Sequence, residues 1–544
     1  MDSTPPDLVL HNARIYTVDE RQPTATALAV RNGRFQVVGT DAEVAEAVPD
    51  APSLDAGGRT IVPGFIDAHA HLQELGHSLR RVDLTDASSP EAVLERLRAF
   101  VSARDLREGT WLRGHGWDET AWSSQTGPTR HLLDDAFPHR PVWLTRTDVH
   151  AGWANTAALD ATVGRSRLRE MSDPDGGRIE RDADGRPTGI LVDAAMALVQ
   201  DQIPAPSPSA RDRALSAALQ HTAERGITGL HDAGVDLNTL RRFQDFIDDD
   251  AFPLRVYAMI SGRGDAFDHF CERGPLHDDS GRLTVESVKF FADGALGSRG
   301  AALLDDYADD PGNRGFLLHE ETSFRRHVQR AVECGFQVNT HAIGDRANRF
   351  VLDAYEAAMA ACTQPVRRPR IEHAQIVAPD DRPRFGALGV IASVQPRFAP
   401  SDMEWAPARL GPARIDRAYA WKSLQEAGAP LAFGSDAPVE PIDPIQGFHA
   451  AVTRQNADGQ PEGGWHPTER LSRATALHAY TQGAARAAFR EDKVGAITPG
   501  TRADFVVLSQ DLMTVPAPRL LDTEVVATYL DGAAVYSQDH WPKQ

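Results

Sequence analysis

The stretch GFIDAHAHLQELG contains two histidines, His69 and His71, that are two residues apart. Alternate residues of a β-strand face the same side, so a strand would aim both imidazoles at one point. Neutral imidazole is the commonest protein ligand for zinc and similar ions. A His-x-His pair arises easily by chance in a chain with 20 histidines. The pair therefore gains meaning only if other polar side chains reach the same place.

Three further polar residues close apolar runs in the same manner. His341 ends FQVNTH, His373 ends RPRIEH and Asp436 ends PLAFGSD. In a parallel α/β barrel the carboxyl ends of the strands converge on one face, where active sites lie. A single histidine at a strand end is more often a hydrogen-bonded core residue than a ligand. Four histidines and an aspartate that arrive in barrel register favour a metal site.

A lysine lies inside another apolar run, VESVKFFADGALGSRGA. The chain has 57 lysines and arginines, of which only four are lysines, and Lys289 is placed where a charge is costly. A buried ammonium beside divalent cations would lose its proton. The neutral amine can add carbon dioxide and become a carbamate, whose two oxygens can hold two metal ions. The alternative is an ordinary ion pair with a nearby acid such as Asp293.

The segments that would carry these residues alternate between strands and helices, with helical stretches such as Ser323–Cys334 and Arg346–Ala361 between them. This rhythm predicts a (β/α)8 TIM barrel. A doubly wound open sheet is the alternative, and the lack of a Gly-x-Gly-x-x-Gly motif after an early strand disfavours it. The predicted strands are Ile61–Ile66, Ile227–Asp232, Leu254–Ile260, Val285–Phe291, Phe336–His341, Arg370–His373, Val390–Gln395 and Pro430–Asp436.

The two ends of the chain have a different pattern. Residues 7–38, 495–512 and 524–537 alternate apolar and polar positions between turn dipeptides such as Asn-Gly and Asp-Gly, which is typical of antiparallel strands. Each segment is too small for a core of its own. We expect residues 1–60 and 495–544 to combine into one minor β domain, with the barrel at 61–494.

A long insertion interrupts the barrel pattern after its first strand. It runs from 75 to 225, roughly 150 residues, which is far more than a strand-to-helix connection requires. We expect a subdomain that caps the barrel mouth and the substrate. Its tryptophans could line the substrate site or could pack the insertion's own core. Five of the chain's nine tryptophans fall here: Trp111, Trp117, Trp122, Trp143 and Trp153.

Composition limits the class of protein. Hydrophobic content of 41% and charged content of 25% are typical of a soluble globular protein. A formal net charge of -20 argues against a nucleic-acid partner. No apolar run reaches membrane-spanning length, the N-terminus lacks signal-peptide features, and three scattered cysteines give no disulfide framework. We expect a cytoplasmic protein that acts on a small molecule; a homodimer would be compatible with this sequence.

The motifs resemble those of the amidohydrolase superfamily, in particular the amidohydrolase family 3 branch that includes N-substituted formamide deformylases. The similarity runs through VPGFIDAHAHLQELG, VKFFADGALGSRGA, THAIGDRA, RIEHAQ, FGSDAPVEPIDP, AYTQGAARAAF and GAITPGTRADFVVL, and it covers nearly the whole chain. The resemblance implies a barrel joined to a composite β-sandwich, which agrees with the pattern of the strands.

The resemblance also implies a binuclear metal centre. His69 and His71 would bind the more buried ion, and carbamylated Lys289 would bridge to a second ion held by His341 and His373. Asp436 would contact the buried ion and carry the proton. Zinc is the expected metal, with manganese, cobalt and iron as alternatives.

Further site residues come from motifs near the family's substrate. GHGWDET and DVHAGWANT in the insertion match such positions, although the second departs from the family's usual Asp-Gly-His-Ser. The catalytic candidates are His115 and His150, and the substrate-binding candidates are Trp117, Asp118 and Arg299. His231, in GLHDAG, could support a ligand or could make only a structural hydrogen bond.

The expected function is hydrolysis of a non-peptide C–N bond of the amide type, such as that of an N-formyl or N-acyl amine, by hydroxide that bridges two divalent metals. Two alternatives stay open. A deaminase of a heterocyclic or nucleobase-like substrate would use the same fold and Asp436, often with one metal ion. A non-catalytic binding or regulatory protein could keep the scaffold.

Overall fold

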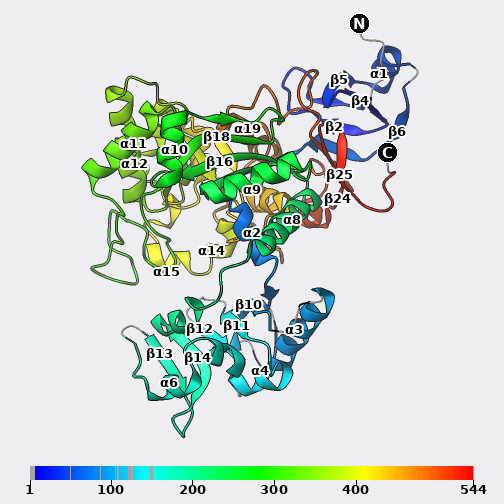
Figure 1. The fold of residues 1–544 in the computed structure, drawn as a ribbon. Coiled ribbons are helices and arrows are strands. Elements are labelled where there is room, and N and C mark those ends of the chain that lie inside the picture. The colour runs from blue at the N-terminus through cyan, green and yellow to red at the C-terminus, as the bar shows by residue number, and fades with distance from the viewer. Residues whose placement is uncertain are drawn as a thin grey trace. The chain divides into compact units, whose positions relative to one another are not determined.

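The computed structural model describes residues 7–49, 51–85, 87–104, 106, 109–119, 122, 127–146, 151–174 and 177–542. The chain forms two compact units. One unit comprises Met1–Glu74 and Ala218–Gln544, and it contains a barrel and a β domain (Figure 1). The other comprises Leu75–Ala217.

The barrel is built from parallel strands that are hydrogen-bonded in the order β22-β21-β20-β19-β18-β16-β15-β8. Helices such as α9 (Leu237–Asp248), α11 (Glu321–Glu333) and α12 (Asp345–Ala361) follow individual strands and cover the outside (Figure 1). The predicted (β/α)8 fold class is thereby confirmed. The strand bounds are β8 (Phe65–Ala70), β15 (Ile227–Val235), β16 (Arg255–Ser261), β18 (Leu283–Phe291), β19 (Gln337–Ala342), β20 (Arg370–His373), β21 (Ile391–Val394) and β22 (Leu431–Phe433).

Strands β8, β20, β21 and β22 are buried along their whole length, which is the pattern of a parallel sheet covered on both faces. Backbone hydrogen bonds beyond the ladder connect the first strand to the last. The Asp436 amide donates to His69 O at 2.7 Å, and the His71 amide donates to Ala437 O at 2.8 Å. The end of β8 and the loop after β22 are therefore held together.

The predicted first strand, Ile61–Ile66, was placed wrongly. The structure divides it between β7 (Thr60–Pro63), which belongs to the β domain, and the barrel strand β8. Gly64 lies between them, where an added Cβ would come within 2.1 Å of Thr228 Oγ1. A side chain at Gly64 would collide with the Thr228 side chain of β15, which favours glycine here. The barrel strand therefore begins later than predicted and extends through His69.

The β domain is a sandwich that joins the two ends of the chain. One sheet has the order β5-β4-β1-β6 and the other β25-β24-β23-β7-β2-β3. Leu28 and Phe35 of the first sheet share one core with Ile61, Phe505 and Tyr529 of the second. The bounds are β1 (Leu8–His11), β2 (Arg14–Tyr16), β3 (Thr24–Ala25), β4 (Ala27–Arg31), β5 (Arg34–Gly39), β6 (Ser53–Asp55), β23 (Phe505–Leu508), β24 (Val525–Leu530) and β25 (Ala533–Ser537).

Polar contacts fasten this domain to the barrel. Arg255, at the start of β16, lies 2.7 Å from Asp504 and 2.6 Å from Asp531 of the β domain. Thr528 Oγ1 donates to Ala223 O at 2.7 Å. Because Asp504 is nearly fully buried, its pairing with Arg255 avoids the cost of an isolated buried charge.

The second unit contains a sheet of its own with the order β13-β14-β12-β11-β10-β9. Helices α3 (Pro90–Arg104) and α4 (Arg130–Ala136) belong to the same unit. Trp117, Trp122 and Trp153 meet in its core, and Trp143 packs in a neighbouring cluster. The remaining bounds are β9 (Val82–Asp83), β10 (Leu112–Trp117), β11 (Val142–Arg146), β12 (Ala151–Ala154), β13 (Gly177–Arg181) and β14 (Pro187–Asp193).

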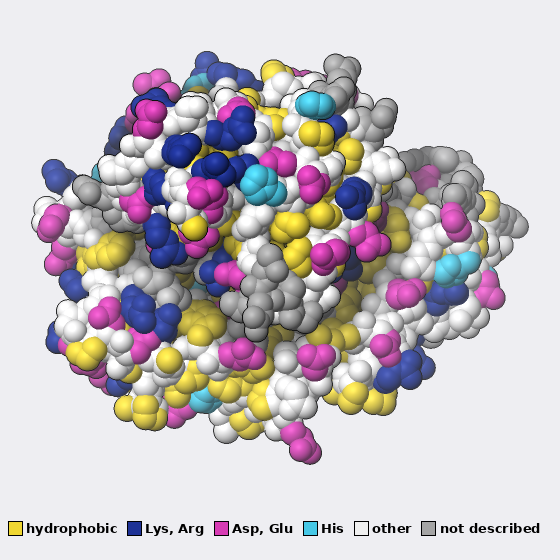
Figure 2. Space-filling view, turned by 90° about the horizontal axis from the view of Figure 1, so that it is seen from below, with side chains coloured by type: hydrophobic (Ala, Val, Ile, Leu, Met, Phe, Trp, Pro, Cys, Tyr) yellow, Lys and Arg dark blue, Asp and Glu magenta, His cyan; other side chains and the backbone are white. Residues whose placement is uncertain are grey.

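The cysteines differ from the expectation. Cys271 of α10 (Asp265–Arg273) forms a disulfide with Cys334, which follows α11, and their Cα atoms are 5.1 Å apart. A separation of 63 residues hid this pair in the sequence. Among the described residues, no helix is long and apolar enough to cross a membrane. Basic side chains lie among acidic ones on the face shown in Figure 2.

Candidate metal centre

Two histidines and an aspartate converge at the carboxyl ends of β8 and β22. Asp436 Oδ1 lies 3.2 Å from His71 Nε2 and 3.5 Å from His69 Nε2. Ligand atoms of the three residues all lie within 4.8 Å of one another. The buried carboxylate of Asp67 organises this junction, because its Oδ1 accepts the amides of both His69 and Ser435 at 3.0 Å.

His341 and His373 lie beside this group. Their ring centroids are 4.5 Å apart, and the His373 ring is 5.0 Å from that of His69. Within the described part of the chain, the buried Nε2 of His341 has no hydrogen-bond partner. Its nearest carboxylate oxygen is Asp293 Oδ1 at 3.6 Å, which is too long for a hydrogen bond. A buried polar atom without a partner suits a metal ligand.

Lys289 projects from β18 toward the same point. Its Nζ lies 3.1 Å from His69 Nε2, and the residue is 2% exposed. Burial lowers the pKa of the Lys289 amine to about 8. The alternative ion pair with Asp293 is absent from the described contacts, because that carboxylate accepts the backbone amides of Ala302, Ile343 and Gly344 instead.

The supporting hydrogen bonds leave one nitrogen of each ring available. His71 Nδ1 lies 2.9 Å from Ala233 O, to which it must donate. His373 Nδ1 lies 2.8 Å from Gln395 Oε1, and His69 Nδ1 lies 2.5 Å from Glu372 Oε2. Donation from Nδ1 places the free electron pair on Nε2. Such partners orient imidazole ligands and raise their basicity.

Glu372 was missed from the sequence, although it precedes His373 directly. It is fully buried inside the barrel, and Arg370, also fully buried, places Nε 2.8 Å from Glu372 Oε1. Arg370 Nη1 in turn lies 2.9 Å from His231 Nδ1. The usable signal was the spacing, since Arg370 and Glu372 are two apart on a strand and therefore face the same side. Arg370 and Glu372 thus connect His231 to His69.

The electrostatics keep three of the histidines and Asp436 in metal-binding forms, whereas the hydrogen bond and charge of Asp436 outweigh burial and raise the pKa of His71. Burial lowers the pKa of His69 to about 3, and it also lowers the pKa values of His341 and His373. All three are therefore neutral at physiological pH. Burial would raise the pKa of Asp436, but the hydrogen bond with His71, whose own pKa is raised by the same contact, holds it below its usual value, so Asp436 is ionised. Neutral imidazoles and an ionised carboxylate are metal-binding forms.

Two of these residues have strained backbones. Asp436 has φ of 61° and His373 has φ of 73°. Residues other than glycine rarely adopt the left-handed region, and those that do often lie at functional sites. Simple strand alternation would point His373 away from the interior that Glu372 faces. The left-handed backbone conformation of His373 changes the direction of its side chain, and the ring lies beside that of His69.

A cavity of about 410 Å³ opens next to the histidines. Its walls are mostly apolar, and Asp402 and Glu440 are the carboxylates that line it beside Asp436. Tyr419 donates to Asp402 Oδ2 at 2.6 Å, and burial raises the pKa of Asp402 to about 7. The apolar side chains are Phe291, Ala295, Leu296, Ile343, Phe398, Trp405 and Val439.

The catalytic and substrate-binding residues predicted in the insertion, where the structure describes them, are not among those that line this cavity. His150 lies outside the described residues. His115 is exposed on β10, and Asp118 follows that strand and is half-buried. Trp117 is 1% exposed, and its Nε1 donates to Leu144 O at 3.0 Å, so its role is in the insertion's core rather than on a substrate wall.

Arg299 lies in the long loop after β18. It forms an ion pair with Asp309 at 3.0 Å, and it is not among the residues that line the cavity. The charge of Arg299 therefore serves to hold two parts of this loop together. The structure therefore does not support the predicted contact between Arg299 and substrate.

Comparisons with known proteins agree with this arrangement. A model of the amidohydrolase family matches residues 53–536. This chain belongs to the amidohydrolase family. It is 31% identical over 98% of its length to the N-substituted formamide deformylase of Arthrobacter pascens, covering 98% of that protein. It is also 35% identical to the Arabidopsis thaliana protein LONG AFTER FAR-RED 3, over 98% of this chain and 93% of that one.

A solved structure extends the similarity to the fold of this amidohydrolase. The match is an uncharacterized metal-dependent hydrolase from Pyrococcus horikoshii, with a TM-score of 0.76 and 29% identity, covering 94% of this chain and 99% of that one. Membership of the family and this neighbour imply a divalent metal. The orphaned Nε2 of His341 fits such an ion, and so do the rings of His69, His71 and His373, which contacts at Nδ1 orient with Nε2 toward the site.

Proposed function

We propose that this amidohydrolase is a binuclear metal enzyme that hydrolyses the C–N bond of a non-peptide amide, with N-formyl and N-acyl amines as the substrate class. The observation that carries the proposal is the convergence of four histidines, Asp436 and a buried lysine at the carboxyl end of the barrel. Hydrolysis adds water across the bond, so that the carbonyl part leaves as a carboxylic acid and the nitrogen part as an amine.

The geometry supports a division of the ligands into two sets. His69, His71 and Asp436 would hold one ion, and His341 and His373 would hold the other. When bound, divalent ions lower the pKa of a water molecule and polarise a carbonyl oxygen. Zinc fits the set of imidazole and carboxylate donors, and manganese, cobalt and iron are the alternatives.

Lys289 would join the two sets of ligands as a carbamate. Its neutral amine attacks carbon dioxide, a C–N bond forms, and the proton lost from nitrogen goes to solvent. The product is an anion with two donor oxygens in place of a cation. The burial of Lys289 and the short distance between its Nζ and His69 Nε2 support this step, because a bare ammonium there would repel the ions that the histidines bind.

Asp436 would move the proton. Its carboxylate is ionised and lies at the edge of the cavity, beside His69 and His71. It can accept a proton from the attacking water and deliver it to the nitrogen as the C–N bond breaks, which is needed because an amine anion is a poor leaving group.

The cavity supports a preference for an apolar substituent. Phe291, Phe398 and Trp405 give it aromatic walls close to the histidines. Burial of such a substituent away from water favours binding. The relative from Arthrobacter pascens is named for N-substituted formamides, which carry a substituent at this nitrogen.

The experiment compares purified wild-type enzyme with Asp436→Asn on N-benzylformamide, N-benzylacetamide, benzylurea and a heterocyclic amine such as adenine. We expect wild-type hydrolysis of at least one amide-type compound and a loss of roughly 10²–10⁴-fold in kcat in the variant. Metal content, measured on the same preparations, should change far less than kcat. Asp345→Asn, a buried carboxylate outside the cavity, is the control.

Full activity of Asp436→Asn would remove its proposed role. Ammonia release from the heterocycle without cleavage of any amide would favour the deaminase instead.

A further inference from the structure

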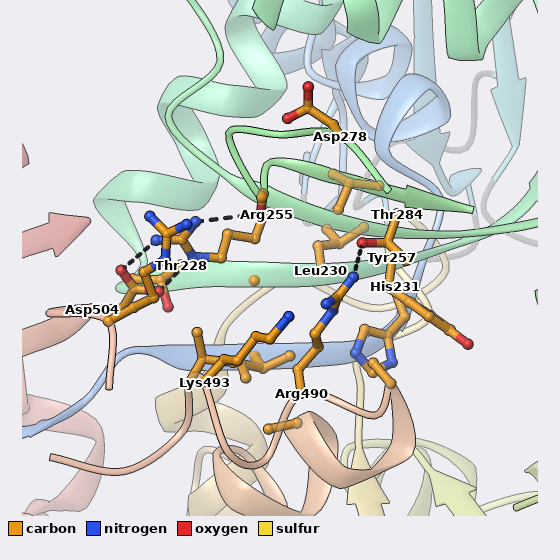
Figure 3. A pocket seen from close by; sticks show the side chains of 18 of the residues that line it. Thr228, Leu230, His231, Arg255, Tyr257, Asp278, Thr284, Arg490, Lys493 and Asp504 are labelled. Carbon is orange, nitrogen blue, oxygen red and sulfur yellow. Dashed lines mark hydrogen bonds and ion pairs between the residues drawn. The ribbon is translucent and has the colours of Figure 1, made fainter. Parts of the chain in front are cut away.

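A second cavity, of about 370 Å³, lies at the opposite end of the barrel from the histidines, where the barrel meets the β domain (Figure 3). It is formed by the first residues of strands, including Thr228 of β15, Arg255 of β16 and Thr284 of β18. Arg490 and Lys493, from the segment after α19 (Gln482–Ala487), complete it. Neither the proposed reaction nor the metal ligands use this space.

One side of the cavity carries charges that are already compensated. Arg255 binds both oxygens of Asp504, at 2.7 and 2.9 Å, and also binds Asp531. Arg502 places Nη1 2.9 Å from Asp531 Oδ1. These groups fasten the β domain to the barrel and have little capacity left for a ligand.

Arg490 and Lys493 differ from Arg255 and Arg502 in their partners. Arg490 Nη2 lies 2.5 Å from Thr284 Oγ1 and 3.1 Å from His277 Nδ1, neither of which belongs to a carboxylate. Within the described part of the chain, neither cation has a carboxylate within 4.0 Å, although the structure contains many such pairs. The charge of Arg490 is the main cause that lowers the pKa of Lys493. Two uncompensated cations thus face one space.

The nearby acidic groups do not fill this role. Glu286 lies 3.3 Å from His277, and Asp278 accepts from Ser280 and from the Arg282 amide. Figure 3 shows the Arg490 and Lys493 side chains extending next to each other into the cavity, with the Asp278 carboxylate on the opposite side. Asp279 also lines the cavity, but it forms no ion pair with either cation in the described structure.

Another part of the wall is apolar, although His231 and Tyr257 also line the cavity. Leu230 and Val256 of the barrel, with Ala485, Ala488 and Val494 from the C-terminal segment, line the space behind the two cations. An apolar body could therefore be buried while a charged end remains with Arg490 and Lys493. The volume is that of a pocket for a small organic molecule.

We propose that this cavity is a binding site for a small organic anion, separate from the metal centre. A carboxylate or phosphate group lies between Arg490 and Lys493, and an apolar body packs against Leu230 and Val256. The arginine supplies a planar pair of donors for such an oxyanion, and the lysine supplies a point charge. Both anion types satisfy the same contacts, so the test separates them.

The test titrates metal-loaded, full-length enzyme by calorimetry with phenyl phosphate, benzoate, inorganic phosphate and neutral benzyl alcohol. Lys493→Met keeps an apolar stem without the charge, and Arg490→Gln keeps hydrogen-bond donors. Lys422→Met is the matched control, because Lys422 lies outside the cavity with Glu426 at 3.8 Å. Thermal unfolding without ligand and amide hydrolysis confirm that each variant is folded.

We expect phenyl phosphate, benzoate or both to bind the wild type, to bind more weakly as salt increases, and to lose roughly tenfold in affinity in each cavity variant. Lys422→Met should bind like the wild type, and benzyl alcohol should bind more weakly than the anions. Binding of phenyl phosphate alone would identify a phosphate ligand, and binding of benzoate alone a carboxylate ligand.

Three results would overturn the proposal. One is the absence of binding by any of the anions to the wild type. Another is affinity that survives in the Arg490→Gln, Lys493→Met double variant, which would place the anion elsewhere, including at the metal centre. The third is inorganic phosphate or benzyl alcohol binding as tightly as the organic anions, because then charge and apolar body would not act together.

Discussion

Glu372 determines which nitrogen of His69 faces the metal centre. Its Oε2 lies 2.5 Å from His69 Nδ1, so Nε2 is left to point at Lys289 and Asp436. Glu372 is also the partner of the fully buried Arg370. One carboxylate therefore orients a ligand and neutralises a cation inside the barrel.

Replacement of Glu372 by alanine should destabilise the protein strongly. The variant leaves Arg370 buried without a charged partner, and loss of one member of a buried ion pair costs about 3–5 kcal/mol. Urea unfolding followed by circular dichroism measures the change. Glu426→Ala is the control, because Glu426 pairs with Lys422 at 3.8 Å on the surface and should lose at most about 0.5 kcal/mol. Equal stability of the two variants would contradict the role given to Glu372.

Asp402 should make stability depend on pH. Burial raises its pKa in the folded protein to about 7, above the value in the unfolded chain, so the native state binds the extra proton. The contribution of Asp402 is thus most favourable near pH 4 and becomes less favourable as pH rises to 7. Relative to Asp402→Asn, the wild type should lose about 3 kcal/mol over this range. Denaturant titrations at several pH values test this, and a constant difference would refute it.

At the residue scale, the side chains at the ends of strands could be predicted from the sequence. The buried residues that hydrogen-bond to them or pair with them could not. His69, His71, His341, His373 and Asp436 follow apolar runs, and the structure brings them together. Arg370 and Glu372 were missed because charged residues were not expected inside a buried strand. Trp117 was misassigned because residue type does not tell whether an indole packs a core or a ligand.

At the scale of elements, the strand order could be predicted because each barrel strand is an apolar run followed by a helix. The bounds of the first strand could not, since β7 and β8 form one apolar stretch that only Gly64 divides. The pairing of Cys271 with Cys334 was equally hidden, because it depends on how α10 and the end of α11 pack against each other. A contact between residues so far apart in the chain leaves no pattern in the sequence around either cysteine.

The bridge between α10 and α11 gives a prediction about these elements. Closing a loop of 63 residues should stabilise the protein by about 4 kcal/mol. Thiol titration of the unfolded protein should find one free thiol, Cys362, before reduction and three after it, and reduction or Cys271→Ser should lower the melting temperature. Cys362→Ser should leave the melting temperature nearly unchanged. Three free thiols in protein purified without reductant would contradict the bridge.

At the scale of the whole molecule, the two ends of one barrel carry different chemistry. The carboxyl ends of the strands hold the histidines, Asp436 and Lys289, whereas the amino ends meet the β domain around Arg490 and Lys493. Fold class and the composite β domain could be predicted from the order of patterns along the chain. The cavity at the amino ends could not, because it combines residues from both ends of the sequence.

The central claim is that Lys289, as a carbamate, holds two metal ions together. The most direct measurement is metal per chain by mass spectrometry in wild type and in Lys289→Ala, with and without a short carboxylic acid such as propionate. We predict two ions per wild-type chain, fewer than two in the variant with hydrolysis lost, and partial recovery of both with propionate. Two ions per chain in Lys289→Ala without propionate, together with normal hydrolysis, would contradict the claim.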